Sequence, residues 1–129
     1  MNKSNSGFDN WGLEDFISDA IRERGWTEPT EIQVESIPHA RRGRDIVGQA
    51  RTGSGKTGAF GIPLLEKCSP SGNVQAIILC PTRELAVQVS DELSILQGKK
   101  GLSIQTVYGG TDIEKQAKRL QEGADTVSY

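Results

Sequence analysis

Two spacings of apolar residues alternate along the chain, and the first is helical. Five apolar residues near the N-terminus recur at intervals of three and four: Leu13, Phe16, Ile17, Ala20 and Ile21. They predict an amphipathic helix over residues 13–24, and Gly25 suits the position just after its end. Thr30 is a candidate N-cap for the next helix. Pro38 predicts the start of a further short helix, because proline is favoured at the first helical position.

The second spacing is a short continuous apolar run, typical of strands buried on both faces of a parallel sheet. Residues 45–48 and 74–80 have this character, and residues 103–108 predict a third strand. A fourth strand would begin at Thr126 and Val127. Helices are predicted between the last three strands, the first of them with an apolar stripe formed by Leu85, Val89, Leu93 and Leu96 and the second over residues 111–120. This alternation predicts an α/β fold with a doubly wound parallel sheet.

Length and composition limit the chain to one domain or part of one. It has 129 residues, a formal net charge of −2 and 25% charged residues. No apolar run is long enough for a membrane span and residues 1–7 lack a signal core, so we expect a cytoplasmic protein without a membrane partner. Cys68 and Cys80 lack metal-ligand spacing and are expected to be reduced. The acidic balance gives no electrostatic indication of nucleic-acid binding, which would have to come from a local site.

The candidate chemistry is concentrated in eight consecutive residues: Ala50, Arg51, Thr52, Gly53, Ser54, Gly55, Lys56 and Thr57. Their spacing is typical of a phosphate-binding loop, although Ala50 stands where the general pattern has glycine. Gly53 and Gly55 would let backbone N–H groups converge, Lys56 would reach the β- and γ-phosphates, and Thr57 would ligate Mg²⁺. A glycine-rich turn is the alternative, but the predicted strand before it and helix after it favour nucleotide binding.

Gln33 has two interpretations that the spacing leaves open. With Thr30 it forms the pattern of a capping box, in which its side chain would accept from the backbone N–H of Thr30. Its amide, which carries donors and acceptors, could instead contact the edge of an adenine. Spacing alone favours the cap.

Four motifs in order give the chain a resemblance to a known family. Phe8 followed by residues 25–33 (Gly-Trp-Thr-Glu-Pro-Thr-Glu-Ile-Gln) is similar to the Q motif of the DEAD-box ATP-dependent RNA helicases. Residues 50–57 resemble motif I, residues 81–86 (Pro-Thr-Arg-Glu-Leu-Ala) resemble motif Ia, and Gly109 with Gly110 stands where the family has its GG motif. The resemblance covers nearly the whole chain.

The resemblance implies ATP and Mg²⁺ as cofactors and RNA, single-stranded or structured, as partner. Lys56 and Thr57 would be catalytic, with Thr57 also on the metal. The remaining nucleotide-binding residues would be those of residues 50–55 together with Phe8, Trp26, Pro29 and Gln33, where Phe8 stacks on the base and Gln33 recognises adenine. RNA would be contacted at its sugar–phosphate backbone by Pro81, Thr82, Arg83, Gly109 and Gly110.

The same resemblance implies a partial RecA-like P-loop domain, truncated before the strand that carries Asp-Glu-Ala-Asp. The expected organisation is a disordered N-terminus over residues 1–7, a helical Q-motif region over 8–42 and an incomplete RecA-like domain over 43–129. A second RecA-like domain would be the partner in the complete protein. Since phosphoryl transfer needs positioned metal, water and cationic groups, we expect this span alone to bind ATP without turnover. The alternatives are another P-loop NTPase and a non-enzymatic module that binds nucleotide or a partner.

Overall fold

The structure of the chain is a computed structural model that describes residues 7–51, 53, 55–107 and 113–128. It divides into two compact units, one ending at Lys67 and the other beginning at Cys68.

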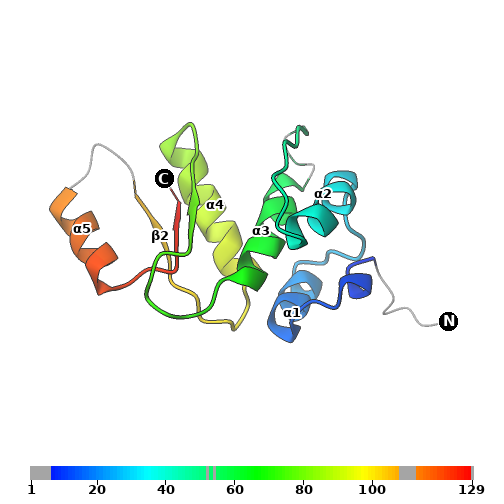
Figure 1. Ribbon diagram of the computed structural model, residues 1–129, viewed down its shortest axis with the longest axis horizontal. Helices are drawn as coiled ribbons and strands as arrows, with labels where there is room; N and C mark the ends of the chain where they lie inside the picture. The colour runs from blue at the N-terminus through cyan, green and yellow to red at the C-terminus, as the bar shows by residue number, and fades with distance from the viewer. Residues whose placement is uncertain (1–6, 52, 54, 108–112, 129) are drawn as a thin grey trace. The chain divides into compact units, whose positions relative to one another are not determined.

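The first unit is helical. It contains the 3₁₀ helix η1 (Asp9–Trp11) and three α-helices, α1 (Asp15–Glu23), α2 (Glu31–Arg41) and α3 (Lys56–Lys67), shown in Figure 1. The helix predicted over residues 13–24 is confirmed, and it ends at Gly25 with φ +79°. α2 and α3 pack along each other. The core of the unit is formed by the buried side chains of Phe8, Leu13, Ile17, Ala20, Ile21, Ile37, Ala59, Ile62 and Leu65.

Two predictions for this unit were wrong. Pro38 does not start a helix but lies inside α2, where the carbonyl of the half-exposed Val34 can be solvated in place of the missing hydrogen bond. Residues 45–48 form no strand: Val47 is fully exposed (103%) and Ile46 is 41% exposed. An extended apolar segment becomes a buried strand only when neighbouring strands pair with it, and the described residues provide none beside it.

The second unit is an α/β layer structure, in which α4 (Arg83–Leu96) connects β1 (Ala76–Ile78) to β2 (Ile104–Thr106). From β2 the chain passes through α5 (Ile113–Glu122) into β3 (Thr126–Ser128). The strand order is β1-β3-β2, and both pairs are parallel. Figure 1 shows α4 and α5 on opposite sides of the strands, as in a doubly wound sheet. The predicted fourth strand is confirmed as the central one of the three.

The expected burial of the strongest apolar run was wrong. Ile77 is 65% exposed and Leu79 75%, because β1 pairs with β3 along one edge and the packed helix α4 contacts β2 and β3. On α4, Val89, Leu93 and Leu96 are buried as predicted, whereas Leu85 is partly exposed and Ala86 takes its place in the core. Tyr108, at the end of the predicted third strand, lies outside the described residues.

A buried carboxylate fastens the strands to the preceding turn. Asp125 is 2% exposed, and its Oδ1 accepts from the backbone N–H groups of Ser71 and Gly72, each at 2.9 Å. Its Oδ2 accepts from the N–H of Ser103 at 2.9 Å. These bonds, above all that from Ser103, hold the pKa of Asp125 below its usual range, against the opposing effect of burial. Asp125 therefore stays ionised and orders three chain segments at once.

Candidate nucleotide and RNA sites

The candidate nucleotide residues gather in the first unit, around the beginning of α3. Lys56 is its first residue and is exposed, and Thr57 is half-buried. Gly53 and Gly55 adopt φ values of +80° and +91°, the left-handed conformation predicted for a curled loop. Ala50 and Arg51 lie in the same segment, while Thr52 and Ser54 lie outside the described residues. The N-terminus of this 12-residue helix is a favourable place for a phosphate group.

Gln33 connects α2 to this loop. It is 1% exposed, its Oε1 accepts from the backbone N–H of Thr30 at 3.0 Å, and its Nε2 donates to the carbonyl oxygen of Gly55 at 3.1 Å. The capping interpretation is therefore confirmed. The reciprocal contact is weaker, since the Thr30 hydroxyl oxygen faces the N–H of Gln33 without forming a full hydrogen bond. That buried oxygen lies beside Gly55 with capacity for a further polar partner.

The close packing here requires glycine at two positions. A Cβ on Gly55 would lie 2.6 Å from the Thr30 hydroxyl and 2.7 Å from Gln33 Nε2. A Cβ on Gly58, in the first turn of α3, would lie 2.5 Å from the same nitrogen and 3.2 Å from the ring of Trp26. The loop, the Gln33 amide and the Trp26 ring thus form one packed group.

Three aromatic residues near the N-terminus form a cluster: Phe8, Trp11 and Trp26. The Phe8 ring is stacked on Trp26, with centroids 6.3 Å apart and an interplanar angle of 18°, and meets Trp11 edge-on at 5.7 Å. The guanidinium of Arg24 lies 5.0 Å from the centre of the Trp26 ring. Phe8 is only 4% exposed, so its ring is almost completely covered within the first unit. Pro29 stands beside Gly7, close enough that a Cβ there would meet its ring at 2.6 Å.

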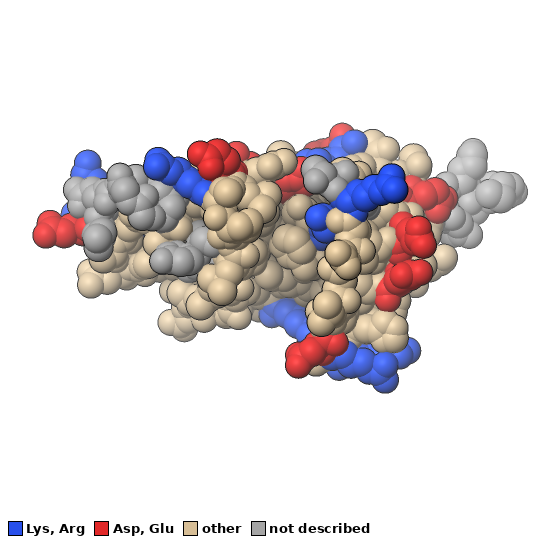
Figure 2. Space-filling view, turned by 90° about the horizontal axis from the view of Figure 1, so that it is seen from above, with Lys and Arg blue, Asp and Glu red and all other residues tan. Residues whose placement is uncertain are grey.

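The candidate RNA residues lie in the second unit, where β1 leads into α4. Thr82 is the N-cap of α4 and accepts from the backbone N–H of Leu85 at 3.2 Å. Pro81 and Arg83 are exposed, and Gly109 and Gly110 lie outside the described residues. On the face drawn in Figure 2, basic and acidic side chains are interspersed with uncharged ones. Any binding of nucleic acid on that face therefore depends on local groups, as expected from the net charge.

Comparison with known proteins decides the family. The sequence model of the DEAD/DEAH box helicases matches residues 30–128. The chain belongs to the DEAD/DEAH box helicase family. It is 47% identical over 116 residues to the ATP-dependent RNA helicase CshA of Limosilactobacillus reuteri, a match that covers 89% of the chain and 23% of that protein.

Solved structures of the family share the fold. A DEAD box protein from Methanococcus jannaschii matches with a TM-score of 0.89 and 48% identity, over 94% of this chain and 33% of that one. The RNA helicase Prp28 from Chaetomium thermophilum, solved bound to ADP, matches with a TM-score of 0.80 and 37% identity, over 98% of this chain and 32% of that one. The chain is thus a partial RecA-like α/β structure that spans a quarter to a third of the length of these relatives.

Some residues that organise the candidate site belong to none of the sequence motifs. Gly58 follows the phosphate-loop pattern and is no part of it, yet it permits the contact between α3, Gln33 and Trp26. Arg41 and Glu66 form an ion pair at the C-terminal ends of α2 and α3, and the spacing along the chain does not reveal it. Within the described ranges, no group of three or more His, Cys, Asp or Glu residues could hold a metal ion by itself. Every helix described is also too short or too polar to cross a membrane.

Proposed function

We propose that the chain belongs to an ATP-dependent RNA helicase, a cytoplasmic ATP hydrolase, and contributes the binding of ATP–Mg²⁺ and of the RNA backbone. The observation that carries the nucleotide part is the contact between Gln33 Nε2 and the Gly55 carbonyl, which fixes the loop at the beginning of α3. The relative named as an ATP-dependent RNA helicase and the RNA helicase solved bound to ADP support the same function. A second RecA-like domain would complete the site in the whole protein.

The residues around the beginning of α3 fit a nucleoside triphosphate. Lys56 is exposed at the N-terminus of α3, where its ammonium would add charge-assisted hydrogen bonds to the helix dipole. The buried Thr30 oxygen beside Gly55 retains hydrogen-bonding capacity. Thr57, the next residue, would supply a hydroxyl to Mg²⁺, and the metal would neutralise phosphate charge.

Adenine would be received beside the aromatic cluster of Phe8 and Trp26. Gln33 would contact the base with the hydrogen-bonding capacity that Thr30 and Gly55 leave over, one N–H and one lone pair. Gln33 donates to the Gly55 carbonyl in the structure without a base, so it also acts on the loop directly.

The RNA strand would meet the beginning of α4. The Thr82 hydroxyl, the Arg83 side chain, the edge at Pro81 and the turn at Gly109 and Gly110 would contact sugar and phosphate. Such contacts carry no sequence information, so we expect binding without base preference.

Binding of ATP and of tripolyphosphate, each with Mg²⁺, tests the nucleotide proposal. Lys56→Ala should remove detectable binding of both ligands, because both present phosphates to the same ammonium. Lys99→Ala, which removes an exposed lysine outside the loop, is the matched control and should change neither affinity. Unchanged ATP affinity in the Lys56 variant would refute the loop assignment.

Gln33→Ala separates the base contact from the loop contact. A base contact predicts that ATP binding weakens more than tripolyphosphate binding, since the second ligand has no base. Equal weakening of both ligands would mean that Gln33 acts only through Gly55.

A further inference from the structure

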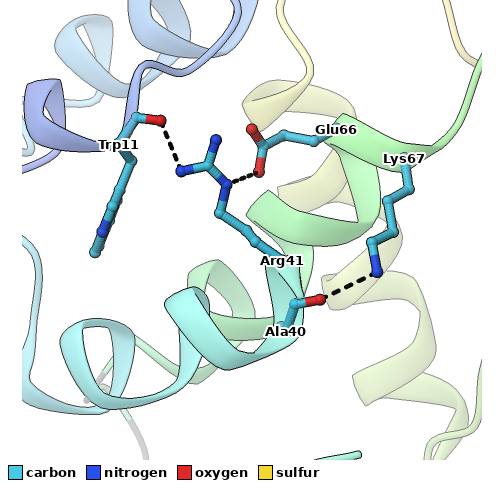
Figure 3. A network of polar contacts seen from close by, with 5 residues as sticks. All are labelled: Trp11, Ala40, Arg41, Glu66 and Lys67. Carbon is cyan, nitrogen blue, oxygen red and sulfur yellow. Dashed lines mark hydrogen bonds and ion pairs between the residues drawn. The ribbon is translucent and has the colours of Figure 1, made fainter. Parts of the chain in front are cut away.

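A polar network ties the N-terminal segment to the far ends of α2 and α3 (Figure 3). At its centre, Arg41 Nη1 donates to the carbonyl oxygen of Trp11 at 2.6 Å, and Arg41 Nε lies 3.2 Å from Glu66 Oε1. Beside it, Lys67 Nζ donates to the carbonyl oxygen of Ala40 at 3.0 Å. A single guanidinium therefore holds a backbone oxygen of η1 and a carboxylate of α3 together.

The segment held by Arg41 also reaches the opposite end of α3. Trp11, whose carbonyl accepts from Arg41, meets the Phe8 ring, and Phe8 is stacked on Trp26. Trp26 in turn packs against Gly58, two residues after Lys56. Residues 8–11 are thus connected to the last turn of α3 through Arg41 and to its first turn through Trp26. A displacement of η1 would move the aromatic cluster relative to the phosphate-binding loop.

We propose that Arg41 is a positioning residue of the nucleotide site, which fixes residues 8–11 on α3 and so holds the aromatic cluster in place for the adenine base. The inference rests on the proposed binding of ATP. Arg41 is the last residue of α2 and contacts Glu66 near the end of α3, whereas Lys56 begins α3. Arg41 therefore acts on the site through Trp11.

The geometry of the contact, rather than the strength of the ion pair, carries this role. The side chains of Arg41 and Glu66 are 33% and 16% exposed, and partly exposed ion pairs contribute little to stability. The Arg41 guanidinium is a rigid planar group, in which one N–H donates to the Trp11 carbonyl while the charge pairs with the Glu66 carboxylate. A lysine offers one flexible ammonium and cannot keep both contacts in that geometry.

The affinities of the 129-residue chain for ATP and for tripolyphosphate, each with Mg²⁺, test the inference. In Arg41→Gln we expect ATP affinity to fall about tenfold while tripolyphosphate affinity stays within about twofold, since only the base side is displaced. Arg41→Lys retains the positive charge and should show the same selective loss, so the test does not depend on one variant folding. Arg22→Gln removes a charge from the exposed pair with Asp19 and is the matched control that should change neither affinity.

Tryptophan fluorescence gives a second measurement, because Trp11 and Trp26 are the only two tryptophans. Release of η1 should increase quenching by acrylamide in both Arg41 variants and not in Arg22→Gln. Equal loss of ATP and tripolyphosphate binding, unchanged ATP affinity, or full recovery by lysine would overturn the inference. If the unmodified chain binds neither ligand, or Lys56→Ala binds as well as it does, the proposed function fails and this inference fails with it.

Discussion

Asp125 offers the most direct test of how the second unit is held together. Replacing it with asparagine keeps the shape of the side chain but removes its charge. The amide oxygen can still accept from Ser71 and Gly72, whereas the amide nitrogen would face the N–H of Ser103, donor against donor. A hydrogen bond to a charged group contributes about 1.5–3 kcal/mol, and roughly half of that remains when the acceptor is neutral.

The expected loss of stability follows from the hydrogen bonds to the carboxylate. The bond from Ser103 is lost, and those from Ser71, Gly72 and, at 3.3 Å, Gln75 Nε2 become weaker. Ser71 and Ser103 are exposed residues, so water recovers part of the loss. We therefore expect Asp125→Asn to lower the free energy of unfolding by about 2–3 kcal/mol. For a chain of this size that is a fall in Tm of roughly 10 °C. Asp91→Asn, which removes the charge of an exposed residue on α4, is the matched control and should shift Tm by about 2 °C or less.

The pH dependence of the free energy of unfolding shows whether the charge of Asp125 causes the difference in stability. Because the folded-state pKa of Asp125 is lowered from 3.8, its contribution to stability is fully present above pH 3.8 and is lost as the pH falls through the folded-state value. Urea unfolding followed by circular dichroism should therefore show a constant difference between the original chain and Asp125→Asn from pH 7 to about pH 5, shrinking below about pH 4. A difference that does not change with pH, or one below about 0.5 kcal/mol at pH 7, would refute the assignment of these bonds.

Two further predictions concern the packing around Gln33. Gly58→Ala should lower the free energy of unfolding by about 1 kcal/mol, because crowding against Gln33 Nε2 and Trp26 outweighs the gain in helix propensity; a higher Tm would contradict this. Gln33→Glu keeps the acceptor for the Thr30 N–H but sets a buried carboxylate oxygen against the Gly55 carbonyl, so binding of ATP and of tripolyphosphate should both weaken at least tenfold. Retained tripolyphosphate affinity in a folded Gln33→Glu chain would show that the Gly55 contact does not shape the loop.

The helices were predictable because their determinants are local. The spacing of Leu13, Ile17 and Ile21 and the Thr82 cap each lie within one or two turns, so the sequence contains the whole signal. The order of strands and helices was likewise enough to predict a parallel α/β sheet. The motif spacing also predicted a helix directly after the glycine-rich loop, and α3 begins there at Lys56.

The burial of the strands was not predictable in this way. An apolar run such as Val74–Cys80 shows that a strand can be buried, but the packing of neighbouring elements decides whether it is. Ile77 and Val47 are exposed because the described residues place no strand on their free side. The role of Asp125 was missed for a related reason: its partners Ser71 and Ser103 are 54 and 22 residues away in the chain.

The side chain of Gln33 makes one contact that the sequence reveals and one that it does not. The sequence presented capping and ligand contact as alternatives, because spacing reveals only the partner three residues before it. In the structure the amide oxygen serves the cap while the amide nitrogen binds Gly55, 22 residues later. The cap orients the side chain of Gln33 so that its nitrogen points at Gly55, and the start of α2 is thereby linked to the candidate phosphate loop. A glutamine satisfies this arrangement better than glutamate, which is an equally good cap, because only the amide combines an acceptor for Thr30 with a donor for Gly55.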